Sequence, residues 1–175
     1  MSSADLISMR ATEVVRLLRK GDVTPSHLLD LLEARCAMVE PAVNALPTRD
    51  FAGARAAAQA LMAKPLDQRG QLCGLPIPIK DLSNVAGMRS TMGSRIFENT
   101  VPATSDLLVT HLEAEGGVIY AKSNTPEFGA GANTFNDVFG FTRNPYDTRL
   151  SAAGSSGGAA AALASGTAWL AHGSD

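Results

Sequence analysis

The sequence predicts an α/β protein in which helices come first along the chain and strands appear later. Apolar residues make up 45% and charged residues 18% of the 175 residues, which is enough apolar material for a buried core. Segments with helical spacing of apolar residues fill most of the first 63 positions, and strand-like segments occur only after about residue 70. From there strands and helices alternate, which is typical of an α/β domain.

Three helices are expected in the N-terminal part. Residues 9–20 have apolar side chains at helical spacing and basic residues toward the end. A second helix should begin at Thr24 and Pro25, which suit an N-cap and a first helical position, and end at Pro41. The alanine-rich residues 51–63 predict the third helix.

The next part of the chain predicts two strands with a helix between them. Residues 74–82 (GLPIPIKDL) are apolar but contain two prolines, which favours an edge or irregular strand. A helix is expected over residues 106–115. A short buried strand over residues 117–121 should follow it directly.

The last 54 positions are expected to contain a loop region, a helix and a strand. Residues 122–150 show no periodicity and predict a long ordered loop, a kind of segment that often carries function. The turn at residues 154–158 should open a helix over residues 159–165, and residues 168–171 should form a final apolar strand.

Composition excludes several classes of function. A net charge of -2 argues against nucleic acid or an acidic membrane surface as a partner, and no apolar stretch approaches the roughly 20 residues of a membrane span. The N-terminus lacks the pattern of a signal peptide, so a cytoplasmic protein with reduced cysteines is expected. The cysteines and histidines are scattered and predict neither a metal site nor a cofactor: Cys36, Cys73, His27, His111 and His172.

The Gly-Ser-Ser-Gly-Gly turn at residues 154–158 has three interpretations. It could be a linker or capping turn without chemistry, or a cradle for phosphate at a helix N-terminus, although the Gly-Lys-Ser/Thr of a P-loop is absent. It also fits Gly-x-Ser-x-Gly, a nucleophile elbow with Ser156 at its centre. An elbow requires an acid and then a histidine downstream, whereas here His172 precedes Asp175.

Lys80 is the second feature that could carry chemistry. It follows an apolar run, and the chain contains four lysines against eleven arginines. A lysine at the end of a strand usually reaches solvent. A lysine in apolar surroundings instead has a lowered pKa and can act as a base near neutral pH.

Taken together, these features resemble the amidase signature family. GLPIPIKDL is similar to the family's catalytic-lysine segment, and GGVIYAKSNTPEFG to a second family segment. GFTRNPYDTRLSAAGSSGG resembles the approach to the glycine- and serine-rich signature, and HGSD the start of the segment that holds the nucleophile. The resemblance runs from about Gly74 to the end, and the N-terminal helices fit the usual lead-in.

The resemblance implies an α/β/α fold with a large mixed sheet flanked by helices, of which this chain is the N-terminal part. Residues 1–68 would be an N-terminal helical segment. Residues 69–175 would be the first part of the core, truncated before the nucleophile.

The resemblance also implies an amidohydrolase with a Ser–cis-Ser–Lys triad and no cofactor. Lys80 would be the base, and Ser155, held by a cis peptide bond, the bridging serine. Ser156 would be a supporting neighbour, as would Ser174 and Asp175, and the nucleophilic serine would lie four positions past Asp175. Two departures from the family, Ala153 in place of glycine and Tyr120-Ala121-Lys122 in place of Leu-Gly-Lys, remove no member of the triad.

Two alternatives stay open at this stage: a non-catalytic fragment or pseudo-enzyme that binds a partner, and an amidotransferase subunit that passes ammonia from glutamine to another protein. The expected partner is a small-molecule amide, with no nucleic acid or membrane, and a homodimer is kept as an assembly to test. The sequence does not indicate which amide is the substrate.

Overall fold

The computed structural model describes residues 3–174. A three-stranded sheet with the order β1-β3-β2 lies at its centre. β2 (Pro76–Lys80) runs parallel to β3 (Val118–Ser123), and the short β1 (Thr48–Arg49) pairs antiparallel with β3 on its other side. The crossover from β2 to β3 contains α5 (Leu107–Ala114), because parallel neighbours cannot be joined by a tight turn.

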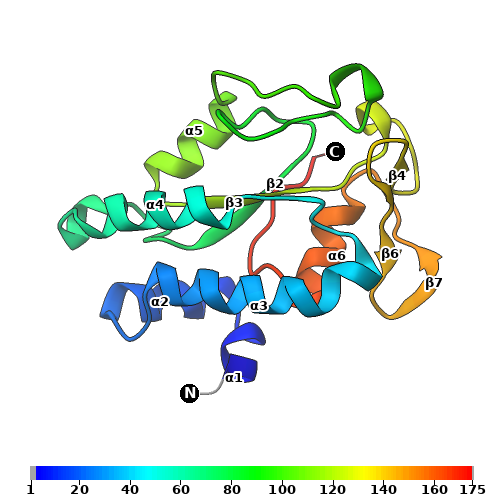
Figure 1. Ribbon diagram of the computed structural model, residues 1–175. Coiled ribbons are helices and arrows are strands. Elements are labelled where there is room, and N and C mark those ends of the chain that lie inside the picture. Colours follow the sequence, from blue (N-terminus) through cyan, green and yellow to red (C-terminus); the bar gives the residue numbers. More distant parts are fainter. Residues whose placement is uncertain (1–2, 175) are drawn as a thin grey trace.

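Helices lie on both sides of this sheet (Figure 1). α2 (Ala11–Lys20), α3 (Pro25–Val43) and α6 (Gly157–Ser165) lie on one side, and α5 lies on the other. α4 (Phe51–Met62) follows β1 directly and packs against both α3 and β3. The remaining helical elements are short: α1 (Ser3–Ile7), η1 (Leu66–Gln68), η2 (Arg95–Phe97) and η3 (Glu127–Gly129).

The two faces of the sheet bury separate apolar clusters. The larger cluster joins the N-terminal helices, α6 and residues such as Leu75 and Tyr120. The smaller one lies under α5 and contains Ile77, Ile79, Val85, Met88, Val109 and Ile119. Because both faces of the sheet are buried, the sequences of β2 and β3 are mostly apolar and do not alternate between apolar and polar residues.

The N-terminal part differs from expectation in two respects. α3 does not end at Pro41 but continues to Val43, where Asn44 takes a left-handed conformation with φ 54°. A proline so close to the end of a helix removes only one N–H from the last turn, so the helix tolerates it. A strand also occurs before residue 70, since Thr48 and Arg49 pair with Lys122 and Ala121. Two residues are too few to produce a sequence pattern.

β2, α5 and α6 lie where they were predicted, and β2 is irregular as expected, with a register shift between Ile77 and Pro78. β3 runs two residues further than predicted, to Ser123. The 68/69 boundary between the two expected segments stays a prediction, and β1 shows that the first segment contributes to the sheet of the second.

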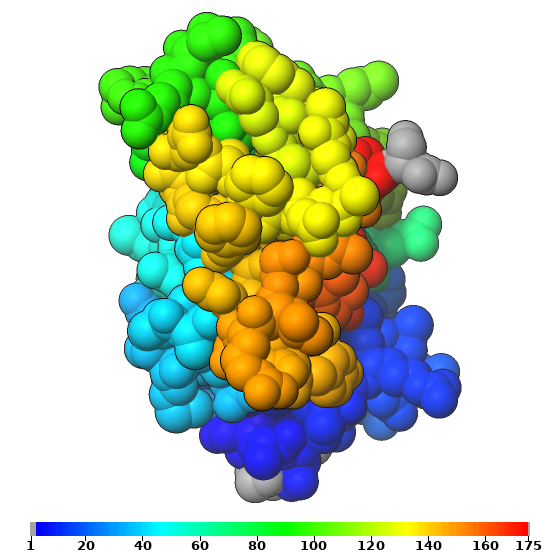
Figure 2. Space-filling model, turned by 90° about the vertical axis from the view of Figure 1, so that its right-hand side faces the viewer, coloured from blue at the N-terminus to red at the C-terminus, as the bar shows by residue number. Residues whose placement is uncertain are grey.

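The prediction of a long loop over residues 122–150 is wrong in detail, because part of this region forms strands. Its second half forms two small antiparallel pairs, β4 (Phe135–Asn136) with β5 (Gly140–Phe141), and β6 (Arg143–Asn144) with β7 (Asp147–Ser151). Figure 2 shows this yellow and orange region on the surface between the green residues 80–105 and the blue N-terminal helices. Strands of two residues carry too little alternation to be recognised in a sequence.

The strand expected over residues 168–171 is absent from the described part of the chain. One backbone hydrogen bond, from His172 N to Pro78 O at 3.2 Å, lies beside β2 at this point. One hydrogen bond does not make a strand pair. The apolar side chains of Ala168 and Trp169 instead pack in the larger apolar cluster. Among residues 3–174, no helix is long and apolar enough to cross a bilayer.

Candidate active site

Lys80 is the last residue of β2, and its side chain is completely buried at 0% exposure. Its Nζ donates to the Oγ atoms of Ser155 at 2.7 Å, Ser156 at 2.9 Å and Ser174 at 2.9 Å. An ammonium has three hydrogens, so these hydroxyls use its full donor capacity. The interpretation of Lys80 as a solvent-exposed strand-end lysine is therefore wrong.

No acidic group within residues 3–174 forms an ion pair with Lys80. Burial without a counter-ion disfavours the charged form, and it lowers the pKa of the Lys80 ammonium below its ordinary value. The N-terminus of α6 faces the same place, and its positive dipole end acts in the same direction. The lowered pKa makes the neutral amine, which is the form that can accept a proton, more accessible than in a solvent-exposed lysine.

The turn that carries the serine pair contains a cis peptide bond and is held by two threonine hydroxyls. The Gly154–Ser155 peptide bond is cis. The Oγ1 of Thr125 donates to Ser155 O at 3.2 Å, and Gly157 N donates to the Oγ1 of Thr134 at 3.1 Å. These contacts hold the backbone of the turn at Ser155 and Gly157.

The two serines of the turn differ in their hydrogen bonds. The Oγ of Ser156 donates to Ser174 O at 3.2 Å and accepts from Ser174 N at 3.1 Å, besides its bond from Lys80. Its one proton is therefore already used. Within the described residues, the Oγ of Ser155 bonds only to Lys80, so its proton is available to a further acceptor. Asp175, the other expected supporting residue, lies outside the described residues.

A second buried lysine was missed by the sequence reasoning. Lys122 on β3 is also 0% exposed, and its Nζ lies 3.1 Å from the Oδ1 of Asp81. Both Lys122 and Thr125 belong to the segment GGVIYAKSNTPEFG, which carries part of the resemblance. That resemblance was the signal that could have found them.

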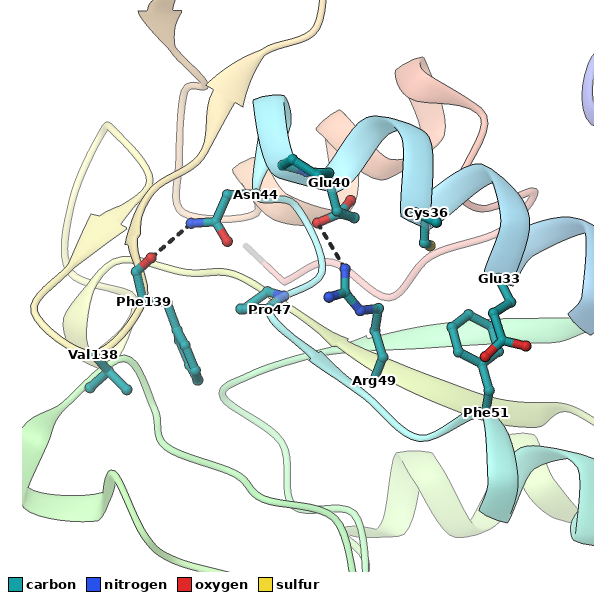
Figure 3. Close-up of a pocket in the computed structure, with 11 residues that line it drawn as sticks. Glu33, Cys36, Glu40, Asn44, Pro47, Arg49, Phe51, Val138 and Phe139 are labelled. Carbon is teal, nitrogen blue, oxygen red and sulfur yellow. Dashed lines mark hydrogen bonds and ion pairs between the residues drawn. The ribbon is translucent and has the colours of Figure 1, made fainter.

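A cavity of about 590 Å³ lies between α3 and residues 138–139, and none of the three serines lines it (Figure 3). Its lining includes Glu40, which is buried and lies 3.8 Å from Arg49. Burial raises the pKa of Glu40, and it raises the pKa of the Cys36 thiol to about 12. The Oε2 of Glu40 also accepts a hydrogen bond from Leu46 N at 2.8 Å, so this carboxylate holds the loop between α3 and β1 against the end of α3.

Cys36 and Cys73 are both free thiols. Within residues 3–174, no group of three His, Cys, Asp or Glu side chains could hold a metal ion.

A protein-family model described as Amidase matches residues 27–175 of this sequence. The chain belongs to the amidase family. The family resemblance drawn from the motifs around Lys80 and the serine pair is thus confirmed, and so is a mixed α/β fold of this type.

The chain is also similar to individual relatives and solved structures. It is 43% identical over 159 residues to a Glutamyl-tRNA(Gln) amidotransferase subunit of Roseiflexus sp. (strain RS-1), covering 90% of this chain and 33% of that protein. A structure of 6-aminohexanoate cyclic dimer hydrolase matches with a TM-score of 0.87 and 29% identity, covering 95% of this chain and 34% of the other.

Fatty acid amide hydrolase matches with a TM-score of 0.91 at 22% identity, covering 99% of this chain and 31% of the other, and a likeness at this identity shows the fold alone. The chain thus spans about a third of the length of the relatives it matches. It corresponds to part of the amidase domain.

Proposed function

We propose that this chain belongs to an amidohydrolase that cleaves a carboxylic amide C–N bond through a Ser–cis-Ser–Lys triad. The observation that carries the proposal is the fully buried Lys80, which has no acidic partner within residues 3–174 and bonds to three serine hydroxyls. A small-molecule amide is the proposed substrate, and the cytoplasm is the proposed location.

In this mechanism Lys80 is the base, and the nucleophilic serine lies four positions past Asp175. The nucleophile gives its proton to the Oγ of Ser155 as its oxygen attacks the amide carbon, and Ser155 gives its own proton to the neutral Nζ of Lys80. The proton returns by the same route to the departing nitrogen, which leaves as an amine or ammonia. Water then attacks the acyl-enzyme ester, and the same relay removes its proton.

Ser155 suits the bridging role better than Ser156 because of the proton each hydroxyl has to give. The proton of Ser156 is already bonded to Ser174 O, whereas that of Ser155 has no competing acceptor in the described chain. Ser156 then orders the segment that contains Ser174, and Ser174 provides a third acceptor for Lys80. Both are supporting groups in this proposal.

An amidotransferase subunit is the second candidate, supported by the names of similar relatives. Its chemistry at Lys80 would be the same, but glutamine would be the amide and another protein would receive the ammonia. Faster hydrolysis of other small amides than of glutamine would favour the hydrolase. Activity with glutamine that depends on partner subunits would favour the transferase.

The test uses protein that contains the residues beyond Asp175 and a fluorophosphonate serine probe with mass spectrometry. We expect inhibition of amide hydrolysis together with one adduct on a serine past Asp175. An adduct on Ser156 would support the nucleophile-elbow interpretation and contradict the proposal. Absence of both labelling and turnover over a broad panel of amides, glutamine included, would favour a non-catalytic protein.

A further inference from the structure

A buried ion pair lies on the opposite face of the sheet from the serine cluster. In the register of β2 and β3, Lys122 is paired with Ile79, and Ser123 with Lys80. Side chains alternate along a strand, so Lys80 points to the face of α6, and Lys122 and Asp81 point to the face of α5. Both members of the pair are at most 1% exposed.

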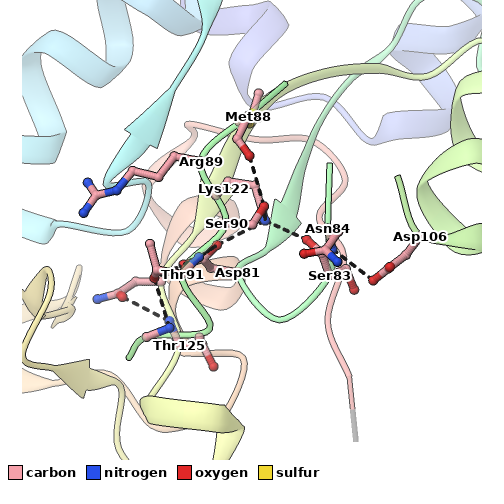
Figure 4. A network of polar contacts seen from close by, with 12 residues as sticks. Asp81, Ser83, Asn84, Met88, Arg89, Ser90, Thr91, Asp106, Lys122 and Thr125 are labelled. Atoms are coloured by element: carbon pink, nitrogen blue, oxygen red, sulfur yellow. Dashed lines mark hydrogen bonds and ion pairs between the residues drawn. The ribbon is translucent and has the colours of Figure 1, made fainter. Parts of the chain in front are cut away.

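The partners of Lys122 form a complete set (Figure 4). Its Nζ donates to Ser83 O at 2.6 Å and to the Oγ of Ser90 at 2.8 Å, and it lies 3.1 Å from the Oδ1 of Asp81. These three acceptors match the three hydrogens of an ammonium. Burial lowers the pKa of Lys122, and the charge of Asp81 opposes that shift.

The carboxylate of Asp81 is held in one orientation. Thr91 N donates to it at 3.1 Å, and the Oγ1 of Thr91 donates to its Oδ2. The backbone N of Asp81 donates to Ser123 O at 3.0 Å, which fixes the end of β2 against β3. The acidic residue next to Lys80 in the chain is therefore directed to a different lysine.

We propose that Lys122 is a positioning residue for the base: it holds Asp81 as its own counter-ion on the α5 face, so that Lys80 keeps only hydroxyl partners. This inference rests on the proposed role of Lys80 as the base. A free Asp81 carboxylate one residue away would attract the Lys80 ammonium and stabilise its charged form.

The charges of the pair act on Lys80 with opposite signs. Loss of the positive charge of Lys122 should raise the pKa of Lys80, and loss of the negative charge of Asp81 should lower it. Two other titratable groups lie within electrostatic reach of this region: Asp106 near Lys122, and His172, whose pKa is lowered by burial and by the charges of both lysines. Asp106 and His172 are kept in every variant of the experiment.

The experiment compares Lys122→Gln, Asp81→Asn and the double variant in protein that extends past Asp175. The side-chain Cε of Lys80 is followed by NMR in lysine-labelled protein, and kcat/KM is measured against pH. We expect the Lys80 titration and the rising limb of kcat/KM to move up by about one pH unit in Lys122→Gln and down by about one in Asp81→Asn. The double variant should lie near the wild type.

Shifts in the same direction, or no shift in a folded single variant, would overturn the proposal. A purely structural pair would lower activity at every pH without moving the rising limb of kcat/KM.

If one single variant does not fold, the other variant alone tests the proposal. If neither folds, the pair is needed for folding and the proposal is rejected. The NMR titration needs no turnover, so opposite shifts in a protein without amidase activity would contradict the proposed function but confirm the effect of the Lys122–Asp81 pair on the pKa of Lys80.

Discussion

At the scale of single residues, the main feature is a lysine whose partners are all neutral. Lys80 bonds to three hydroxyls, and the acidic side chain next to it is bonded to Lys122 instead. A lysine with a carboxylate partner would keep its proton at neutral pH. The arrangement therefore separates a structural ion pair from a group that can change its protonation state.

The first prediction concerns Lys80→Ala in protein that carries the residues beyond Asp175. Loss of the base should lower kcat by about 10²–10⁴-fold with little change in fold, measured by steady-state kinetics and circular dichroism. Lys20→Ala, at an exposed position, is the control and should retain wild-type kcat. A Lys80→Ala variant with more than a tenth of wild-type activity would contradict the assignment.

The second prediction concerns the dependence of activity on pH. The base must be neutral to accept a proton, and burial lowers the pKa of Lys80. As the pH falls through that pKa the amine becomes protonated, so kcat/KM should fall with falling pH, and its midpoint should lie below the ~10.4 of free lysine. A midpoint at or above 10.4 would show that Lys80 is not the titrating base.

The third prediction compares the adjacent serines. Ser155→Ala should remove the proton path and lower kcat by orders of magnitude. Ser156→Ala removes three supporting hydrogen bonds, each worth about 0.5–1.5 kcal/mol, but leaves the proton path in place, so its loss of kcat should be much smaller. Steady-state kinetics of the two variants, measured in parallel, show which substitution lowers kcat more. The reverse order would favour Ser156 as the nucleophile.

At the scale of elements, α6 brings the serine turn against β3 by a close backbone approach. A Cβ added at Gly158 would lie 2.3 Å from Asn124 N, directly after β3, and 2.8 Å from Ala45 O, between α3 and β1, and both are backbone atoms that cannot rotate away. Gly158 N also donates to Asn124 O at 3.2 Å. The first turn of α6 therefore requires a glycine at this position.

The fourth prediction follows from this contact. Gly158→Ala should lower the free energy of unfolding by about 1–3 kcal/mol through overpacking. Ala160→Ser, exposed on the same helix, should change it by no more than about 0.5 kcal/mol. Trp169, the only tryptophan and a buried residue whose Nε1 donates to Leu6 O, reports the denaturant transition by fluorescence. Equal stability of the two variants would show that α6 can shift away from β3.

At the scale of the whole molecule, the chain corresponds to about a third of its relatives. The proposed base, the proposed bridging serine and their proposed supporting groups Ser156 and Ser174 fall within this third, whereas the proposed nucleophile does not. Base and bridge without a nucleophile offer no covalent route.

The fifth prediction is therefore that residues 1–175 alone hydrolyse no amide. Protein that includes the segment past Asp175 should hydrolyse its substrate under the same conditions. The measurement is release of amine or ammonia from an amide panel, with Lys80→Ala protein as the blank. Turnover by residues 1–175 above that blank would place the nucleophile among the described serines.

The sequence alone determined the helices α2, α4, α5 and α6, the irregular strand β2 and the family. These depend on local signals: apolar spacing, caps, prolines, and short motifs whose order is preserved along the chain. It also singled out Lys80 and the serine pair, because a lysine after an apolar run and a glycine-rich turn are visible without a structure.

The contacts that these groups make depend on the tertiary structure. Lys80 is 75 positions from Ser155 and 94 from Ser174, and their contact depends on how β2 and α6 pack. The pairing of Asp81 with Lys122 rather than with Lys80 depends on the register of β2 against β3, which places the two lysines on opposite faces of the sheet. Distant contacts and strand register arise from packing of the whole chain, and no local pattern in the sequence encodes them.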